Sequence, residues 1–156
     1  MDCPPDIPLL AYRIAALFDG IGASLYGARW SSPGRPVIYA ATTFAGAMLE
    51  VLVHAGIGRV PRHTQWIEIS IPAGVSRECP EPHAFPGWDD QGCVVSRAFG
   101  GAWLSERRSA VLLVPSVVTR RERNVLINPA HPDYQQIVAT DPVPVEWDRR
   151  LFIRAH

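Results

Sequence analysis

The sequence predicts an α+β fold: a mixed or antiparallel sheet forms the core, with a few helices around it. Several short segments have the alternating or continuous apolar pattern of strands, and two longer segments have the spacing of helices. Fifteen prolines are spread over the chain, so elements should be short and loops frequent. The length of 156 residues favours a single domain over residues 1–156, with a core at about 11–153.

The first elements expected are three strands. One begins at Ala11 and runs to about Ile14. The segments 24–30 and 36–41 should form a hairpin, because Pro33-Gly34 between them is favoured at the centre of a type II turn. This hairpin would place Arg29 and Tyr39 on neighbouring strands.

A helix follows at about residues 44–55. Thr42 or Thr43 is a suitable N-cap, and Gly56 and Gly58 can end the helix. At about 100° per residue, one face is apolar, two further leucine and valine positions lie nearly opposite, and a narrow polar strip remains. That strip holds Thr43, Gly46, Glu50 and His54. Because Gly46 has no side chain, we expect it to leave space for a ligand one turn before Glu50.

The second half of the chain predicts further alternation of strands and helices. Residues 110–118, "AVLLVPSVV", form a continuous apolar run that suits a central strand buried on both faces. The other expected elements are a strand at 65–72, a surface loop at 72–92, a helix at 96–109, a strand at 124–129, a short helical turn at 131–138 and a final strand at 147–153.

Glu50 is the first candidate functional residue, because it lies among Met48, Leu49, Val51 and Leu52. Burial of an unpaired carboxylate costs several kcal/mol, so the position needs an explanation. Three remain open from the helix alone. The carboxylate could face solvent beside His54, form a structural ion pair with a buried arginine such as Arg29, or line a cleft and act on a substrate.

Composition excludes several classes of function. Net charge is zero, so nothing drives the chain as a whole toward nucleic acid or acidic membranes, and we expect no direct DNA binding. No apolar run reaches the roughly 18 residues of a membrane span, and the N-terminus does not resemble a signal peptide. We therefore expect a soluble cytoplasmic protein. The three cysteines and five histidines match no zinc pattern, so no metal site is predicted.

Two segments resemble the RES-domain family. "GARWSSPGRPVIYAATTFAGAMLEVLVH" at 27–54 is similar to its N-terminal signature, and "FGGAWLSERRSAVLLVPSVVTRRERNVLINPAHPDY" at 99–134 is similar to its C-terminal one. Any single piece is weak, but the combined order of G-x-R-W, Y, an embedded E, V-P-S and N-P-x-H-P is specific. Val125 stands where an aromatic residue is common, a peripheral departure.

This resemblance implies a fold similar to diphtheria-toxin-type ADP-ribosyltransferases and a role as the toxin of a bacterial toxin–antitoxin pair. Members of the family consume NAD+ by hydrolysis or phosphorolysis, or transfer ADP-ribose to a protein. NAD+ would thus be the substrate, with no cofactor. The implied partner is a cognate Xre-like helix-turn-helix antitoxin that blocks the active site and binds operator DNA. A homodimer, or a hetero-oligomer with the antitoxin, is expected.

The family motifs carry over to four residues: Arg29 in "GARW", Tyr39 in "VIYAA", Glu50 in "MLEVL" and Ser116 in "VPSVV". Glu50, Arg29 and Ser116 are the predicted catalytic residues. Arg29, Tyr39 and Ser116 are also predicted to bind substrate, together with two residues of lower rank, Asn124 and His131.

The predicted chemistry is cleavage of the nicotinamide–ribose bond. Nicotinamide leaves as a neutral group, and positive charge develops on the ribose. A fixed carboxylate, here Glu50, would bind the ribose hydroxyls and stabilise that cation. The Arg29 guanidinium matches a diphosphate by paired hydrogen bonds.

Two other positions, Tyr39 and Ser116, have weaker chemical arguments. Tyr39 could stack on nicotinamide or orient the ribose, and the hydroxyl of Ser116 could bind a ligand amide or hydroxyl. Each also has a plain structural alternative, a core tyrosine and a serine bonded to a backbone carbonyl. Trp30, Phe44 and Trp103 are predicted to be core residues.

Parts of the sequence fit three rival functions. A serine hydrolase could use Ser116, His131 and Asp133, but "VPSVV" lacks the Gly-x-Ser-x-Gly elbow. A dinucleotide-binding oxidoreductase is weaker, because "DGIGASLYG" lacks the third glycine of the fingerprint and is not expected to open a helix. A non-catalytic module that only binds a helix-turn-helix partner would tolerate Glu50→Gln without loss.

Overall fold

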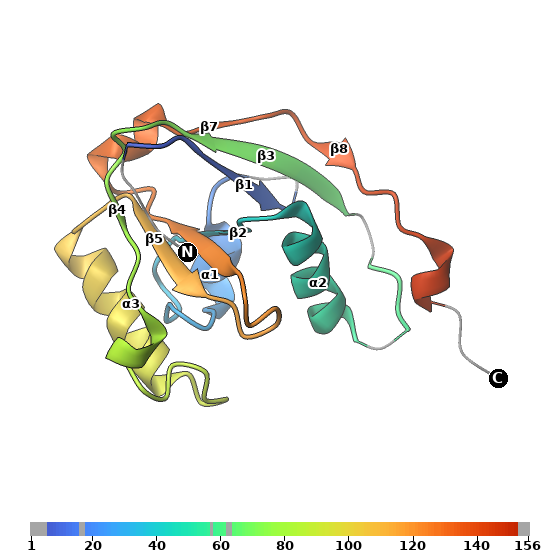
Figure 1. Cartoon of the computed structure of the whole chain (residues 1–156), viewed down its shortest axis with the longest axis horizontal. Helices are drawn as coiled ribbons and strands as arrows, with labels where there is room; N and C mark the ends of the chain where they lie inside the picture. Colours follow the sequence, from blue (N-terminus) through green and yellow to red (C-terminus); the bar gives the residue numbers. More distant parts are fainter. Residues whose placement is uncertain (1–5, 16–17, 57, 62–63, 153–156) are drawn as a thin grey trace.

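The computed structural model describes residues 6–15, 18–56, 58–61 and 64–152, and it confirms the α+β class (Figure 1). Within these residues one curved sheet of eight strands carries three α-helices and three short 3-10 helices. The elements in chain order are β1 Leu9–Arg13, α1 Ile21–Tyr26, β2 Ile38–Ala41, α2 Phe44–Ala55, β3 Gln65–Ile71, β4 Arg77–Glu78, η1 Pro82–Ala84, α3 Val94–Glu106, β5 Val111–Pro115, β6 Arg123–Ile127, η2 Pro132–Gln136, β7 Val138–Ala139, β8 Val143–Pro144 and η3 Arg149–Phe152.

The sheet is mixed, in the order β4-β5-β6-β2-β1-β3-β7, and β8 also pairs with β3. The pair β4–β5 is parallel, and the other described pairs are antiparallel. Strand β5 is buried at all five positions, which confirms the prediction of a central strand buried on both faces.

The predicted hairpin of residues 24–30 with 36–41 is wrong. Residues 21–26 form helix α1, and both edges of β2 are taken, by β1 on one side and by β6 on the other. No edge of β2 is therefore left for a hairpin partner. Arg29 lies in a tight turn closed by a bridge between Ala28 and Ser31, and it is not on a strand.

Helix α1 also corrects a second expectation. The segment "DGIGASLYG" does open a helix, which begins directly after Gly20, although it is only six residues long. The third glycine of the dinucleotide fingerprint is still missing, and the sheet is mainly antiparallel, so a dinucleotide-binding oxidoreductase gains no support.

Side chains alternate between the two faces of the sheet and form two apolar clusters. One face carries Ile38, Val111, Leu113, Val125 and Ile127 among others. The opposite face carries Leu112, Val114 and Leu126, and there they pack against Trp103 and Leu104 of α3 and against Trp30. The apolar core on the face that α3 covers therefore fixes Trp30 and the chain just before it.

Helix α2 confirms the predicted helix at 44–55 and its cap. The Thr43 hydroxyl accepts a hydrogen bond from the Gly46 backbone N–H, and Gly56 follows the last helical residue. Phe44 packs against Tyr12 and Trp66, which anchors the first turn on the sheet. In Figure 1, α3 is seen to the left of the β5–β6 pair and α2 to its right.

Two further expectations need correction. The predicted surface loop at 72–92 contains strand β4, which pairs with β5, and the 3-10 helix η1. The predicted final strand at 147–153 is wrong as far as it is described: residues 149–152 form the 3-10 helix η3, and residue 153 lies outside the described residues. The edge of β3 that such a strand could use is occupied by β7 and β8.

Helix α3 begins and ends slightly earlier than the predicted 96–109, and η2 matches the predicted helical turn after His131. Among the described residues no helix has both the length and the apolar character needed to cross a membrane.

Candidate active site

A carboxylate with two neutral hydrogen-bond donors forms the centre of the candidate site. One oxygen of Glu50, Oε1, accepts a hydrogen bond of 3.0 Å from the Ser116 hydroxyl and one of 2.9 Å from the Asn124 side-chain amide. Glu50 is half-buried. Among the residues that the structure describes, no hydrogen bond to the other carboxylate oxygen, Oε2, is found. The carboxylate is therefore held through one oxygen and has the other available.

The sheet explains why these residues meet. Asn124 lies on β6 directly opposite Val114 of β5, so its side chain is on the face that α2 and α3 cover. Ser116 follows the last residue of β5, and its backbone N–H is bonded to the Glu122 carbonyl at the start of β6. The ends of the two strands thus bring a hydroxyl and an amide to the same point beside α2.

The hydroxyl of Ser116 both donates and accepts a hydrogen bond. It donates to Glu50 Oε1 and accepts from the Thr119 backbone N–H at 3.1 Å. This fixes the direction of its proton, because a hydroxyl has a single proton to donate. The structural alternative of a serine that donates to a backbone carbonyl does not describe this residue.

The other readings of Glu50 find no support. His54 is exposed, and within the described residues no salt bridge joins Glu50 to His54 or to Arg29. The carboxylate is instead surrounded by neutral hydrogen-bond donors.

Tyr39 lies on the same face of the sheet, two residues before Ala41, which pairs with Asn124. Its hydroxyl shares a 2.8 Å hydrogen bond with the Ser31 hydroxyl. Burial raises the pKa of Tyr39 to about 12, and the bond to Ser31 opposes part of that rise. Because this pKa is well above neutral, the phenol keeps its proton at physiological pH and can act as a hydrogen-bond donor.

Arg29 is held in place by helix α3 and by the segment that precedes α3 in the chain. The Arg29 carbonyl accepts a 2.7 Å hydrogen bond from the Ser96 hydroxyl, and Arg97 donates to the neighbouring Ala28 carbonyl at 3.0 Å. On the side chain, Nη1 donates to the carbonyls of Trp88 and Asp90. Within the described residues no hydrogen bond uses Nε or Nη2, so one edge of the guanidinium is left for an anionic ligand.

A second arginine fixes the loop on which Arg29 rests. Arg120, from the β5–β6 loop, forms a 2.7 Å salt bridge with Asp89 and lies over the Trp88 ring. The hydrogen bond from Arg120 lowers the pKa of Asp89, with Arg29 adding a smaller effect, so the carboxylate stays ionised. The β5–β6 loop therefore contacts both α2 and the 88–90 loop.

His131 is not part of this cluster. It follows β6 at the end opposite Asn124, and its Nδ1 accepts a hydrogen bond from the Asp133 backbone N–H, which caps η2. Since Ser116 donates to Glu50, the three residues of the rival serine hydrolase do not form a connected triad.

The structure adds a residue that the sequence analysis did not single out, Glu122. Glu122 accepts a 2.8 Å hydrogen bond from the Thr43 hydroxyl. A Cβ added at Gly46 would lie 2.8 Å from Glu122 Oε2, so the space that Gly46 leaves is filled by this carboxylate. The expectation that Gly46 leaves space for a ligand is therefore wrong. Glu122 directly precedes β6, two residues before Asn124, and this position beside a candidate residue was the one signal that could have found it.

The predicted core aromatics are confirmed in two cases. Trp30 and Trp103 are buried, whereas Phe44 is only half-buried in its contact with Tyr12 and Trp66.

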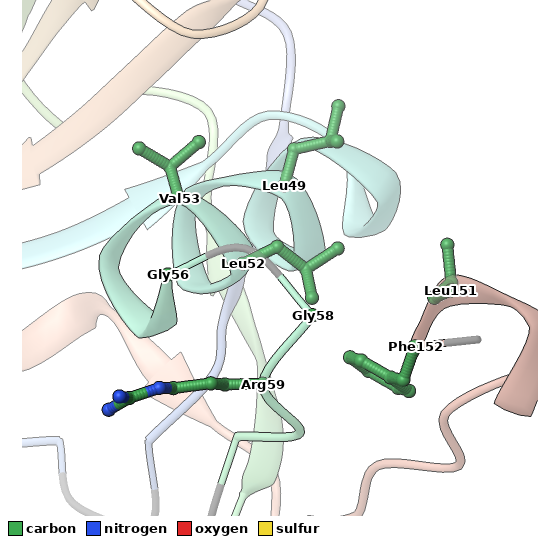
Figure 2. A pocket seen from close by; sticks show the side chains of 8 residues that line it. All are labelled: Leu49, Leu52, Val53, Gly56, Gly58, Arg59, Leu151 and Phe152. Carbon is green, nitrogen blue, oxygen red and sulfur yellow. The ribbon is translucent and has the colours of Figure 1, made fainter. Parts of the chain in front are cut away.

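A separate apolar groove lies between α2 and η3 (Figure 2), with a volume of about 370 Å³. In Figure 2 the side chains of Leu52 and Phe152 point toward each other across it. The lining residues are Leu49, Leu52, Val53, Gly56, Gly58, Arg59, Leu151 and Phe152. Among the described residues, Glu50, Ser116 and Asn124 do not line this groove, and Arg59 is the one ionisable residue that does.

Comparison with known proteins gives a consistent result. The model of the RES domain matches residues 6–148. The chain is 41% identical over 140 residues to the "Prs ADP-ribosylating toxin" of Sphingobium sp. (strain YBL2), covering 87% of each chain. It is 38% identical over 150 residues to "Toxin Res" of Pseudomonas putida, covering 92% of this chain and all of that toxin.

A solved structure shares the fold. The crystal structure of the Mycobacterium tuberculosis MbcT–MbcA toxin–antitoxin complex matches with a TM-score of 0.69 and 18% identity, over 88% of this chain and 84% of that chain.

Proposed function

The chain belongs to the RES-domain family, and from this we propose that it is the toxin of a bacterial toxin–antitoxin pair and that it cleaves the nicotinamide–ribose bond of NAD+. Hydrolysis or phosphorolysis of that bond would deplete NAD+ and arrest growth. The partner we propose is a cognate Xre-like helix-turn-helix antitoxin. Its presence in a complex is suggested by the toxin–antitoxin structure that shares the fold.

The observation that carries the proposal is the arrangement of Glu50. Ser116 and Asn124 both donate to Oε1, which fixes the plane of the carboxylate. Oε2 is the oxygen that could accept from a ribose hydroxyl. A negative group fixed in advance beside the ribose stabilises the positive charge that develops there as nicotinamide leaves, and it needs no reorganisation at that moment.

The neutral donors around Glu50 support this role. A salt bridge to an arginine would neutralise the carboxylate, and it would then stabilise a cation less well. Ser116 and Asn124 orient the charge without cancelling it. Nicotinamide departs as a neutral molecule, so the reaction needs no acid to protonate the leaving group.

Arg29 and Tyr39 supply the remaining binding contacts in this proposal. The edge of the Arg29 guanidinium that holds no backbone carbonyl is suited to the diphosphate of NAD+. Tyr39, whose protonated hydroxyl is already paired with Ser31, presents an aromatic face on the same side of the sheet as Asn124.

A second function has one specific observation in its favour. The relative that is 41% identical is named an ADP-ribosylating toxin, so this chain could transfer ADP-ribose to a protein. The step at Glu50 is the same in both reactions, because water, phosphate and a protein side chain all attack the same ribosyl cation. The two proposals differ only in the acceptor.

The test is a mass-spectrometric product assay with NAD+ on purified protein freed of antitoxin, with and without phosphate. Wild type should release nicotinamide, and Glu50→Gln should be slower by about a hundredfold or more because the amide carries no negative charge. Glu106→Gln, an exposed carboxylate paired with Arg108, is the matched control and should equal wild type.

Each outcome separates the candidates. ADP-ribose or its phosphorylated form identifies hydrolysis or phosphorolysis. NAD+ that stays intact unless an extract is added, with a labelled protein appearing from radioactive NAD+, identifies the transferase. If wild type consumes no NAD+ and labels no protein, with or without extract, the non-catalytic binding module is the better account. Equal activity of wild type and Glu50→Gln would show that Glu50 is not the catalytic carboxylate.

A further inference from the structure

A continuous polar seam joins α2 to the start of β6. Glu122 directly precedes β6, and Asn124 is the second residue of that strand. Glu122 contacts Thr43, and Asn124 contacts Glu50. Thr43 and Glu50 are seven residues apart on the helix, which is about two turns, so both face the same way.

The two residues that precede α2 are bonded to the start of β6 at several points. The Thr42 backbone N–H and hydroxyl both donate to the Arg123 carbonyl, at 3.2 and 3.1 Å. The Thr43 hydroxyl donates to Glu122 and accepts from the Gly46 N–H. Because the hydroxyl has one proton, the carboxylate of Glu122 sets the orientation in which Thr43 caps the helix.

Gly46 shows how closely the carboxylate approaches. Its backbone does not have a positive φ, so the conformation does not require glycine. A Cβ at this position would lie 2.8 Å from Glu122 Oε2 and 2.9 Å from the Thr43 hydroxyl oxygen. A glycine at position 46 is therefore explained by the position of Glu122.

We propose that Glu122 is a positioning residue for Glu50. It sets the distance between the N-terminus of α2 and the start of β6. Glu50 lies farther along the same helix, so that distance decides whether Glu50 meets Ser116 and Asn124. A helix transmits such a displacement along its axis almost rigidly, since every turn is held by its own hydrogen bonds. This inference rests on the proposed function, because it assigns Glu122 a role in the same reaction.

The first test compares two substitutions of Glu122 in the NAD+ assay. Glu122→Gln keeps an oxygen that accepts from Thr43, so its kcat should stay within about threefold of wild type; Glu122→Ala should lower kcat by about tenfold or more, since small misplacements of reacting groups are costly. KM should change less than kcat, because the diphosphate contact proposed for Arg29 is untouched. The control is Glu78→Ala on β4, which removes a half-buried carboxylate paired with Arg108 and should keep full activity.

The second test uses Gly46. The Cβ of Gly46→Ala would push the Glu122 carboxylate away from Thr43, so kcat should fall. The melting temperature should not fall, because alanine is a better helix former than glycine. In the double variant Gly46→Ala/Glu122→Ala the carboxylate is gone, and the two losses should not add. A purely structural role of Glu122 would lower the melting temperature and leave kcat per folded molecule unchanged.

The outcomes are distinguishable from failure of the proposed function. If wild type consumes NAD+ and Glu122→Ala retains its kcat, or if Glu122→Gln loses as much as Glu122→Ala, the positioning role is wrong while the function of Glu50 stands. If wild type shows no activity with NAD+ in either assay, the proposed function is wrong and this role falls with it.

Discussion

Helices α2 and α3 lie on the same face of the sheet, but they are held there in different ways. Helix α3 buries Trp103 and Leu104 in the apolar cluster over β5 and β6. Its Gly100 lies so close to the Trp30 carbonyl that an added Cβ would overlap it. In helix α2 only Gly46 and Ala47 are buried, and Leu49 and Val53 are exposed.

The difference indicates how stability and geometry are divided in this molecule. Apolar contact is strong but has little preferred direction, so it suits α3, whose task is to hold the backbone around Arg29. Hydrogen bonds contribute only about 1 kcal/mol each but fix direction. They suit α2, which must present one carboxylate at a defined angle to Ser116 and Asn124.

The largest effect is expected where α3 packs. Trp103→Ala should lower the free energy of unfolding by about 3–5 kcal/mol, because it empties a fully buried site. It also removes the donor to the Ser109 hydroxyl. Chemical denaturation measures the loss, and Trp103→Phe is the control that keeps most of the volume and should lose much less. A loss below about 1 kcal/mol would mean that apolar packing does not hold α3.

The sequence predicted those parts of the fold that a local pattern determines. Helix α2 with its Thr43 cap was found because cap, apolar stripe and stop are all neighbours in the chain. Strand β5 was found because burial on both faces leaves an unbroken apolar run. Glu50 stood out in the helix pattern, whereas Arg29 and Ser116 came from the family resemblance, and the structure brings Glu50 and Ser116 into contact.

The errors arise where distant segments compete. Residues 24–30 have the composition of a strand, but β1 and β6 occupy both edges of β2, and no local pattern reveals that. Glu122 lies within the charged stretch "TRRER", which reads as solvated, and only the position of α2 turns it toward Thr43. Asn124 is a candidate of lower rank in the sequence, and no local pattern reveals its contact with Glu50, which is 74 residues away in the chain.

An intermediate effect is expected at the cap of α2. Thr43→Val keeps the shape of the side chain but loses the bonds to Gly46 and Glu122, which should lower the free energy of unfolding by about 1 kcal/mol. The catalytic rate with NAD+ should fall as well, because the seam is opened at its first contact. Thr43→Ser retains the hydroxyl and should stay close to wild type in both measurements. If Thr43→Val were as stable as wild type, hydrogen bonding would not be what holds α2.

The smallest effect is expected on the outer side of α2. Leu49 is 45% exposed and lines the groove beside η3. Because glutamine has nearly the same helix propensity as leucine, Leu49→Gln should change the free energy of unfolding by less than about 0.5 kcal/mol.

The same substitution on α3 completes the comparison. Leu104 is 8% exposed, so Leu104→Gln loses a buried leucine and places an amide in its site, which should cost about 2 kcal/mol or more. Thermal unfolding of the two variants at equal protein concentration measures both. A loss for Leu49→Gln as large as that for Leu104→Gln would show that an apolar contact covers the outer side of α2 in solution. The two helices would then be held by the same kind of force, and the angle of Glu50 would depend on that contact as well as on the seam with β6.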